Sequence, residues 1–241
     1  LGETYAQWPM LDQYTAFHAA DGIRGLVAEP NAYYSARFMP NGDFTSVAIT
    51  GLVTGLSEIG QHVNYVPRSL REAYPTAMAP QFQQLGYAVD FWYGGVPSWE
   101  GMDRFSAAQG FDHFYGYPDF HATKVNAWGT SDAQLFAALE QHLVDEPPTV
   151  HLIMTVSNHP PYDIDVVAEG FDLENARAEA AKLPNVDDPD QLALELGHYW
   201  YMDKIVTDFV HATMEKYPDS LFVITGDHAV RMNPSRTPTM Y

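Results

Sequence analysis

The chain has 241 residues, a formal net charge of −19 and no cysteine. This length can bury one sizeable core, so we expect a single domain over residues 1–241. The acidic balance argues against nucleic acid or an anionic membrane surface as the main partner, and the lack of cysteine excludes disulfides and thiol chemistry.

The sequence shows neither a signal-peptide pattern nor a run of about 18 apolar residues, so no segment of it is expected to span a membrane. It opens at Leu1-Gly2-Glu3-Thr4 with no strand before it, and it closes soon after the last apolar run. We therefore expect a fragment that is truncated at both ends. A cysteine-free chain suits an extracytoplasmic location.

The first informative stretch is a turn followed by a helix. After a helical segment from about Leu11 to Ala20, the residues Pro40-Asn41-Gly42-Asp43 are typical of a turn. Apolar residues then recur at near-helical spacing, and Gly55 offers a stop. Thr45 thus stands where a loop becomes a helix, and unpaired N–H groups at such a position favour an anion. The alternative is that Asp43 or Thr45 is only an N-cap.

The middle of the chain predicts a helix, a strand and a second helix. The helix covers Ala77–Leu85 and the strand covers Tyr87–Tyr93, followed by Gly94-Gly95 and an aromatic loop with Trp99. Ser131 or Asp132 caps a further helix that runs to about Leu143. We interpret this capped helix as structural.

Two later apolar runs each end in polar residues. Val150–Val156 leads into Ser157-Asn158-His159, and Leu221–Thr225 leads into Gly226-Asp227-His228. Both runs predict buried parallel strands, whose carboxyl ends meet at one edge of a sheet. A carboxylate beside an imidazole at that edge suits Zn or Mn. The alternative is that Asp227 caps a turn and His228 is a polar loop residue.

The other histidines have no motif around them. We interpret His151 as a core residue inside its strand. The rest are interpreted as surface or core polar residues: His18, His62, His113, His121, His142, His198 and His211.

The motifs together resemble a known family. Gly42-Asp43-Phe44-Thr45 with Val53-Thr54-Gly55-Leu56, Ser157-Asn158-His159 and Thr225-Gly226-Asp227-His228 are similar to motifs of the lipoteichoic acid synthase family, sulfatase-like phosphotransferases of the alkaline phosphatase superfamily. The resemblance covers nearly the whole chain, to Arg236-Thr237-Pro238. It implies an α/β fold, a three-layer α/β/α sandwich with a mainly parallel central sheet.

The resemblance also implies the roles of individual residues. Thr45 is the nucleophile, and His159 contacts the phosphate or the leaving group. Because the chain lacks the Cys/Ser-x-Pro-x-Arg signature, a sulfatase formylglycine is not expected. The expected metal ligands are Glu3, Thr45, Asp227 and His228, and the substrate-binding candidates are His159, Tyr93 and Trp99. The family analogy favours Mn²⁺, with Zn²⁺, Mg²⁺ and Ca²⁺ as alternatives.

The implied function is metal-dependent phosphotransfer or phosphodiester hydrolysis on a glycerophosphate-type or other lipid headgroup, through a phospho-threonine intermediate. The expected substrate is an anionic phospholipid or phosphoglycan, at the extracytoplasmic face of the membrane or in the periplasm, within a membrane-anchored parent protein. No nucleic acid is expected.

Three departures from the family leave other functions open. The family's glycerophosphate-holding histidine, tryptophan and arginine are matched here by Tyr93, Glu100 and Met102. Loss of the arginine removes a bidentate phosphate clamp. The alternatives are a phosphoethanolamine transferase, a sulfatase-like hydrolase, or a catalytically silent relative that binds a glycan or lipid headgroup.

Overall fold

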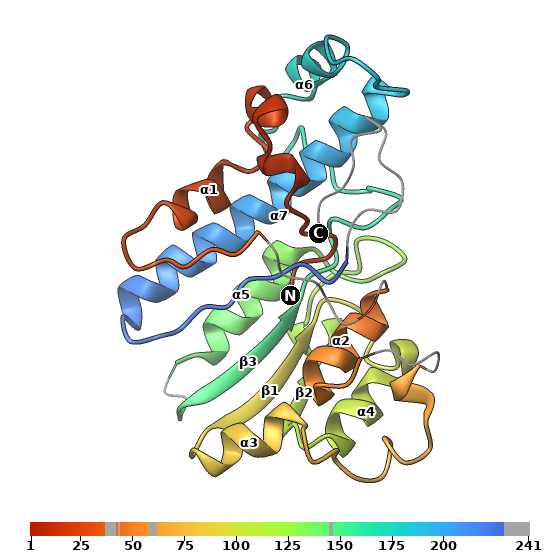
Figure 1. The fold of residues 1–241 in the computed structure, drawn as a ribbon, viewed down its shortest axis with the longest axis vertical. Coiled ribbons are helices and arrows are strands. Elements are labelled where there is room, and N and C mark those ends of the chain that lie inside the picture. The colour runs from red at the N-terminus through yellow and green to blue at the C-terminus, as the bar shows by residue number, and fades with distance from the viewer. Residues whose placement is uncertain (37–41, 43, 58–61, 145–146, 229–241) are drawn as a thin grey trace. The chain divides into compact units, whose positions relative to one another are not determined.

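The computed structural model of the protein describes residues 1–36, 42, 44–57, 62–144 and 147–228 (Figure 1). The chain forms two compact units. The sheet unit consists of Leu1–Glu3, Pro40–Val156 and Gly226–His228, and the helical unit of Thr4–Met39, Ser157–Thr225 and Ala229–Tyr241. The predicted turn at 40–43, apart from Gly42, and the tail motif at 236–238 lie outside the described residues.

The sheet unit is built on three parallel strands (Figure 1). They are β1 (Ala88–Tyr93), β2 (His113–Tyr115) and β3 (Thr149–Met154), in the order β2-β1-β3. The helices of this unit are α2 (Thr45–Thr54), α3 (Met78–Gln84), α4 (Met102–Ala108) and α5 (Asp132–His142), with 3₁₀ turns η3 (Val63–Tyr65), η4 (Trp99–Gly101) and η5 (Tyr117–Phe120). The predicted strands near 87–93 and 150–156 and the Ser131-capped helix are confirmed.

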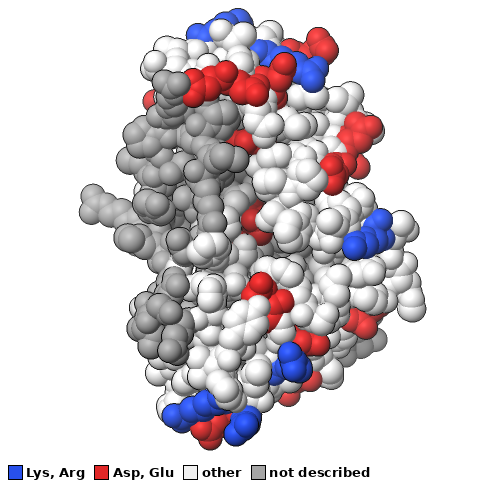
Figure 2. All heavy atoms as spheres, turned by 90° about the vertical axis from the view of Figure 1, so that its right-hand side faces the viewer, with Lys and Arg blue, Asp and Glu red and all other residues white. Residues whose placement is uncertain are grey.

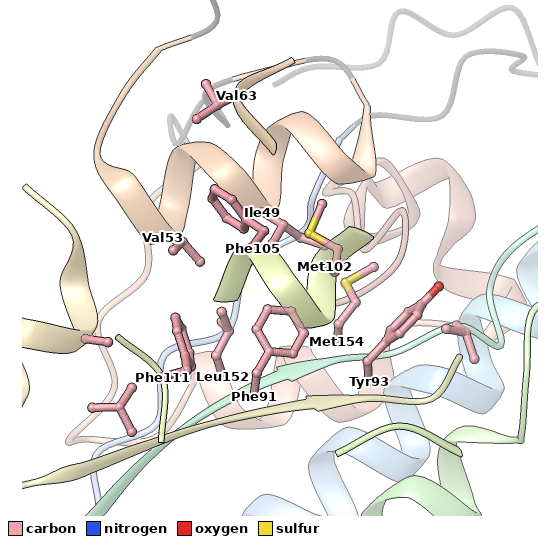
Figure 3. Close-up of a cluster of buried hydrophobic side chains, with 13 residues drawn as sticks. Ile49, Val53, Val63, Phe91, Tyr93, Met102, Phe105, Phe111, Leu152 and Met154 are labelled. Atoms are coloured by element: carbon pink, nitrogen blue, oxygen red, sulfur yellow. The ribbon is translucent and has the colours of Figure 1, made fainter. Parts of the chain in front are cut away.

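A hydrophobic core fills one side of this sheet. Side chains alternate along a strand, so Val89, Phe91 and Tyr93 point to one face of β1. Figure 3 shows this face packed against side chains of α2 and α4. The core residues labelled there are Ile49, Val53, Val63, Phe91, Tyr93, Met102, Phe105, Phe111, Leu152 and Met154. The opposite face of β1 is in contact with α5. The sheet unit therefore has three layers, and the predicted α/β fold is confirmed.

Helix α2 begins where the sequence predicts. Phe44 is extended and its carbonyl accepts the N–H of Ala48 at 2.8 Å, so the first helical residue is Thr45. The helix ends at Gly55, whose φ of 71° is left-handed and favours glycine. Most of the helix is buried, which fixes the position of its first residue.

The helical unit is organised around one long helix. Its elements are η1 (Trp8–Met10), η2 (Asp12–Phe17), α1 (Asp21–Val27), α6 (Leu173–Ala180) and α7 (Pro189–Lys216). The Asp188 side chain caps α7 by accepting the N–H of Gln191 at 3.0 Å. Asp203 of α7 accepts the N–H of Gly22 at 2.7 Å and so holds the start of α1. The helix expected from Leu11 to Ala20 is mostly a 3₁₀ segment.

Helix α7 buries a carboxylate that opposes folding at neutral pH. Glu195 is 7% exposed, and its Oε1 accepts a hydrogen bond from Gln191 Nε2 at 2.9 Å. Among the described residues its Oε2 has no hydrogen-bond partner. Burial raises the pKa of Glu195 from 4.5 to about 7, the Gln191 hydrogen bond lowers it and the charge of Asp188 raises it. The folded protein therefore favours the protonated carboxyl group.

We expect Glu195→Gln to stabilise the protein above pH 7. The stabilising contribution of protonated Glu195 is fully present below pH 4.5, and it is lost as the pH rises through about 7. At pH 8 the variant should be more stable by up to about 3 kcal/mol, and near pH 4.5 the difference should vanish. Urea unfolding across this range measures the effect. Glu215→Gln, an exposed substitution on the same helix, is the control.

The run 221–225 was wrongly predicted as a buried interior strand. The structure gives these residues no strand, and Leu221 and Val223 are 88% and 78% exposed. Pairing starts only at Gly226, which forms a parallel bridge with Gly2. No bridge is formed by 221–225 with the other described residues. A partner strand, which a sequence pattern does not supply, decides whether an apolar run becomes a strand.

Charged side chains on the surface form small mixed groups. Figure 2 shows blue basic side chains beside red acidic ones on one face. Measured pairs include Arg68–Glu72 at 2.7 Å and Lys204–Asp208 at 2.8 Å, both solvent-exposed. Such exposed pairs contribute about 0–1 kcal/mol each. None of the helices in the described ranges combines the length and apolar character that crossing a bilayer requires.

Candidate metal centre

The first three residues extend the sheet beyond β3. The amino group of Leu1 donates to the Ile153 carbonyl at 2.7 Å, and the Thr155 N–H donates to the Leu1 carbonyl at 3.2 Å. The Glu3 N–H then donates to Thr155 Oγ1 at 2.9 Å. These bonds hold Glu3 at the carboxyl end of β3, the edge where ligands bind in parallel sheets.

A second connection brings the end of the described chain to the same place. Gly226 pairs with Gly2 in a parallel bridge, and the Asp227 N–H donates to the Gly2 carbonyl at 3.2 Å. Asp227 and His228 follow directly. The sheet edge thus carries Glu3, Asp227 and His228 together, although two of them come from the far end of the sequence.

The side chains of these residues converge with Thr45. Carboxylate and imidazole atoms of Glu3, Asp227 and His228 lie within 4.8 Å of one another. His228 Nε2 is 3.4 Å from Asp227 Oδ2 and 3.7 Å from Glu3 Oε1. Thr45 Oγ1 is 3.3 Å from His228 Nε2 and 3.4 Å from Glu3 Oε2. The predicted ligand set is therefore brought to one point in the sheet unit.

Two buried carboxyl groups dominate the electrostatics of this cluster. The side chains of Glu3 and Asp227 are 4% and 0% exposed. Burial raises the pKa of Glu3 well above its usual range, and the charge of Asp227 raises it further, whereas the Thr45 hydrogen bond lowers it. Two adjacent buried negative charges are unfavourable unless a cation or a proton accompanies them.

The donor set fits a divalent metal ion. Ligand atoms placed 2.0–2.2 Å from a tetrahedral ion are about 3.4 Å apart. The separations of 3.3–3.7 Å among Thr45, Glu3, Asp227 and His228 lie near this value. Two carboxylates, an imidazole and a hydroxyl also suit Zn²⁺ or Mn²⁺ by chemistry. The fit holds for the residues that the sequence predicts as ligands.

The other predicted site residues, Tyr93, Trp99 and His159, have contacts of their own. Tyr93 is 4% exposed and its ring centroid lies 5.6 Å from that of Trp99. Burial raises the pKa of Tyr93, with contributions from the charges of Glu3 and Glu100. His159 belongs to the helical unit, where its Nδ1 lies 2.6 Å from the Pro160 carbonyl oxygen. Binding roles for these three residues stay predictions.

Glu100 and Met102, which replace the family's phosphate-holding residues, have structural contacts in this chain. Met102 is 1% exposed and lies in the core of the sheet unit. Glu100 accepts a hydrogen bond from the Tyr65 hydroxyl, and its carbonyl accepts one from Asn64 Nδ2 at 2.7 Å. The matched position 102 is thus a packing position in this chain.

Two supporting residues were missed in the sequence. Thr155 accepts the Glu3 N–H through its hydroxyl. Asp132 is fully buried, accepts the Val156 N–H at 2.8 Å, and adds its charge to those that raise the Glu3 pKa. The available signals were a threonine directly after an apolar run and an acidic residue after a helix cap. Both patterns are common, so neither singles out a metal centre.

A comparison with protein-family profiles shows to which family the chain belongs. The profile of the Sulfatase family matches residues 28–240, which include Thr45, Asp227 and His228, whereas Glu3 precedes the match. The chain belongs to the sulfatase family. Curated proteins give no match to the sequence.

Solved structures support the same fold for this sulfatase-family chain. A protein in the alkaline phosphatase superfamily from Vibrio parahaemolyticus has a TM-score of 0.75 at 19% identity, over 100% of this chain and 56% of its own. The lipoteichoic acid synthase LtaP from Listeria monocytogenes has 0.66 at 22% identity, over 91% and 52%. The C-terminal periplasmic domain of EcEptC from Escherichia coli, in complex with Zn, has 0.67 at 13% identity, over 100% and 64%.

These similarities confirm the predicted fold. At such identities they establish the fold and leave the substrate open. The chain spans between about half and two thirds of the length of these structures. Proteins with this fold include phosphoryl transferases and hydrolases that use divalent metal ions. The cluster of Glu3, Asp227 and His228 at the sheet edge is consistent with such a metal centre.

Proposed function

We propose that the chain is a metal-dependent phosphotransferase or phosphodiester hydrolase with Thr45 as its nucleophile. The observation that carries the proposal is the position of Thr45 Oγ1, 3.3 Å from His228 Nε2 and 3.4 Å from Glu3 Oε2. Thr45 is also the first residue of α2, where backbone N–H groups and the helix dipole favour an anionic group.

The proposed ligands of the ion are Glu3, Thr45, Asp227 and His228. The family analogy favours Mn²⁺, and the zinc complex of EcEptC supports Zn²⁺ as the first alternative, before Mg²⁺ and Ca²⁺. A bound divalent ion lowers the pKa of a ligated hydroxyl and neutralises charge on phosphoryl oxygens. The protein residues fix the distance and direction between the Thr45 oxygen and the phosphorus.

The reaction proceeds in two displacements at phosphorus. Thr45 Oγ1 loses its proton and forms a P–O bond, while the ester bond to the leaving alcohol breaks and that alcohol takes up a proton. A second hydroxyl then attacks the phospho-threonine and frees Thr45. In a transferase this hydroxyl belongs to an acceptor, and in a hydrolase it is water. From the family resemblance, we propose that His159 contacts the oxygens of the phosphate or of the leaving group.

The proposed substrate is an anionic phospholipid or phosphoglycan with a glycerophosphate-type or other lipid headgroup. The similarity to a lipoteichoic acid synthase and to a periplasmic domain supports this class and an extracytoplasmic location, within a membrane-anchored parent protein. Loss of the family's arginine clamp, with Glu100 and Met102 in that loop, favours a headgroup other than polyglycerolphosphate. Tyr93 and Trp99 are the proposed substrate-side residues.

A sulfatase-like hydrolase is the second candidate, because the matching family is named for that activity. The two functions separate in one experiment. The chain is assayed with bis(p-nitrophenyl) phosphate and with p-nitrophenyl sulfate, each with Mn²⁺, Zn²⁺ or EDTA. We expect metal-dependent turnover of the phosphodiester and a p-nitrophenyl phosphoryl mass increment on the Thr45 peptide, because one of the two ester groups stays on the phosphorus. Turnover of the sulfate ester alone indicates a sulfatase, and metal binding without turnover of either indicates a silent binder.

His159→Ala tests the role assigned to the Ser157-Asn158-His159 motif. A neutral imidazole donates one hydrogen bond, and an imidazolium adds charge as the transition state becomes more negative. We expect turnover to fall about 10²–10³-fold, with metal content unchanged. His211→Ala, an exposed substitution on α7, is the control. Unaltered turnover in His159→Ala would show that the motif is only a turn after β3.

A further inference from the structure

A second group of metal-ligating side chains lies on the face of the sheet opposite the core. Asp90 of β1 is in register with His113 of β2 and with His151 of β3, so the three residues form one row across the sheet. Residues paired in register point to the same face. His142, the last residue of α5, reaches this row from the covering helix.

The carboxylate at the centre of the row is buried and contacts two imidazoles. The Asp90 side chain is 3% exposed. His113 Nδ1 lies 3.0 Å from Asp90 Oδ1, and His142 Nε2 lies 3.8 Å from Asp90 Oδ2. The two rings are 62% and 34% exposed, so the buried carboxylate is reached from solvent through histidines.

In the described part of the chain, the buried carboxylate of Asp90 is surrounded by imidazoles rather than by lysine or arginine side chains. A buried carboxylate is unfavourable unless a positive group accompanies it. Among the described residues, no lysine or arginine forms an ion pair with Asp90, and its charged-group contacts are the two imidazoles. A metal ion between the carboxylate and the imidazoles would supply that positive charge. Imidazole with carboxylate is a ligand set that Zn²⁺ prefers.

Aromatic residues fix the orientation of the surrounding rings. Trp92 Nε1 donates to His151 Nδ1 at 3.2 Å, which occupies that nitrogen as an acceptor. The Trp92 ring lies 5.0 Å from the His142 ring and 4.3 Å from the Tyr115 ring, measured between centroids. His142 is therefore packed against Trp92, whereas the largely exposed His113 ring is held by its contact with Asp90.

We propose that Asp90, His113 and His142 form a second divalent-metal site that accepts Zn²⁺ or a similar imidazole-preferring ion. The separations of 3.0 and 3.8 Å bracket the spacing of about 3.4 Å between tetrahedral ligand atoms. The imidazoles contact different oxygens of Asp90, and the three residues do not have ligand atoms that all lie within 4.8 Å of one another, so binding requires the His113 ring to turn toward His142. The ion would tie β1, β2 and α5 together.

This site is separate from the cluster around Thr45. His151, in register with Asp90, precedes Thr155 by four residues along the strand direction, which corresponds to about 13 Å. One ion cannot serve both groups. The second site therefore does not depend on the proposed catalytic function, and each site can fail without the other.

Zinc stoichiometry of four purified proteins tests the proposal. The chain, Asp227→Ala, His113→Ala and the control His211→Ala are loaded with Zn²⁺, dialysed and analysed for bound metal. We expect about two equivalents for the chain and the control, and about one for His113→Ala. Asp227→Ala should keep the ion at Asp90, and adding His142→Ala to it should remove that ion.

The same samples loaded with Co²⁺ report the ligands through their visible absorption. The expected result is a nitrogen- and oxygen-ligated spectrum in Asp227→Ala that disappears when His113 is also replaced. Because His113 is largely exposed, its alanine variant should fold, which far-UV circular dichroism checks. Unchanged zinc content in His113→Ala and in the His142→Ala double variant would overturn the site. An Asp227→Ala protein with no bound zinc would overturn it as well.

Discussion

Thr45→Ala should reduce phosphodiester turnover about 10⁴-fold or more and leave the fold intact. Removal of a nucleophile that works with positioned partners has effects of this size in other enzymes. Within α2, the Thr45 hydroxyl is the group that meets both Glu3 and His228. Stability should change little, because helix α2 is held by its buried apolar residues.

Thr45→Ser is the matched variant for this experiment. It keeps the hydroxyl at the start of α2 and should retain measurable turnover, along with the p-nitrophenyl phosphoryl mass increment on residue 45. Initial rates with bis(p-nitrophenyl) phosphate and far-UV circular dichroism are measured for both variants. Equal rates for the chain and Thr45→Ala would exclude Thr45 as the nucleophile.

Asp227→Asn should lose both the metal ion and turnover. Asp227 is fully buried and stands 3.4 Å from His228, so the ion would lose a charged ligand at the centre of the cluster. We expect metal affinity to fall by more than about 100-fold, because changes outside the ligand shell already cost about 10–100-fold. Bound metal after dialysis and turnover with excess metal are the two measurements.

Stability separates a lost ligand from a damaged fold. Without metal, Asp227→Asn removes the charge that helps to raise the Glu3 pKa, so the metal-free variant should be more stable than the metal-free chain at neutral pH. With metal, the order should reverse, because only the unaltered chain gains binding free energy. Asp208→Asn, at an exposed position, should change neither value. A variant that is less stable under both conditions would contradict the metal role of Asp227.

The parts of the fold that follow from local patterns were predictable. The apolar runs that became β1 and β3 and the glycine that ends α2 are each decided within a few residues. The run 221–225 is similarly apolar, yet Leu221 and Val223 are exposed and pairing begins only at Gly226, with Gly2 from the other end of the sequence. Pairing between distant segments depends on the whole folded chain, so the local sequence of a segment does not predict it.

The same distinction applies to the two proposed metal sites. Asp227 and His228 follow an apolar run, and Thr45 follows a turn, so their chemistry was visible in the sequence. His113 and His142 stand in no motif and were interpreted as polar residues of the surface or core. Their relation to Asp90 comes from strand register and from the last turn of α5, which only coordinates show. Glu3 was predicted through the family resemblance rather than from its own neighbours.

The bridge between Gly2 and Gly226 brings distant segments of the chain together at the candidate metal centre, so a bound ion would cross-link them. Thr45 and His228 are 183 residues apart in the sequence, and a shared ion would join them. Cross-linking a loop of that size lowers the entropy of the unfolded chain by an amount worth about 5 kcal/mol in the loop-closure treatment used for disulfides. A metal ion at this edge would therefore act on the whole polypeptide, and chelators should make the segments around Gly2 and Gly226 more sensitive to proteases.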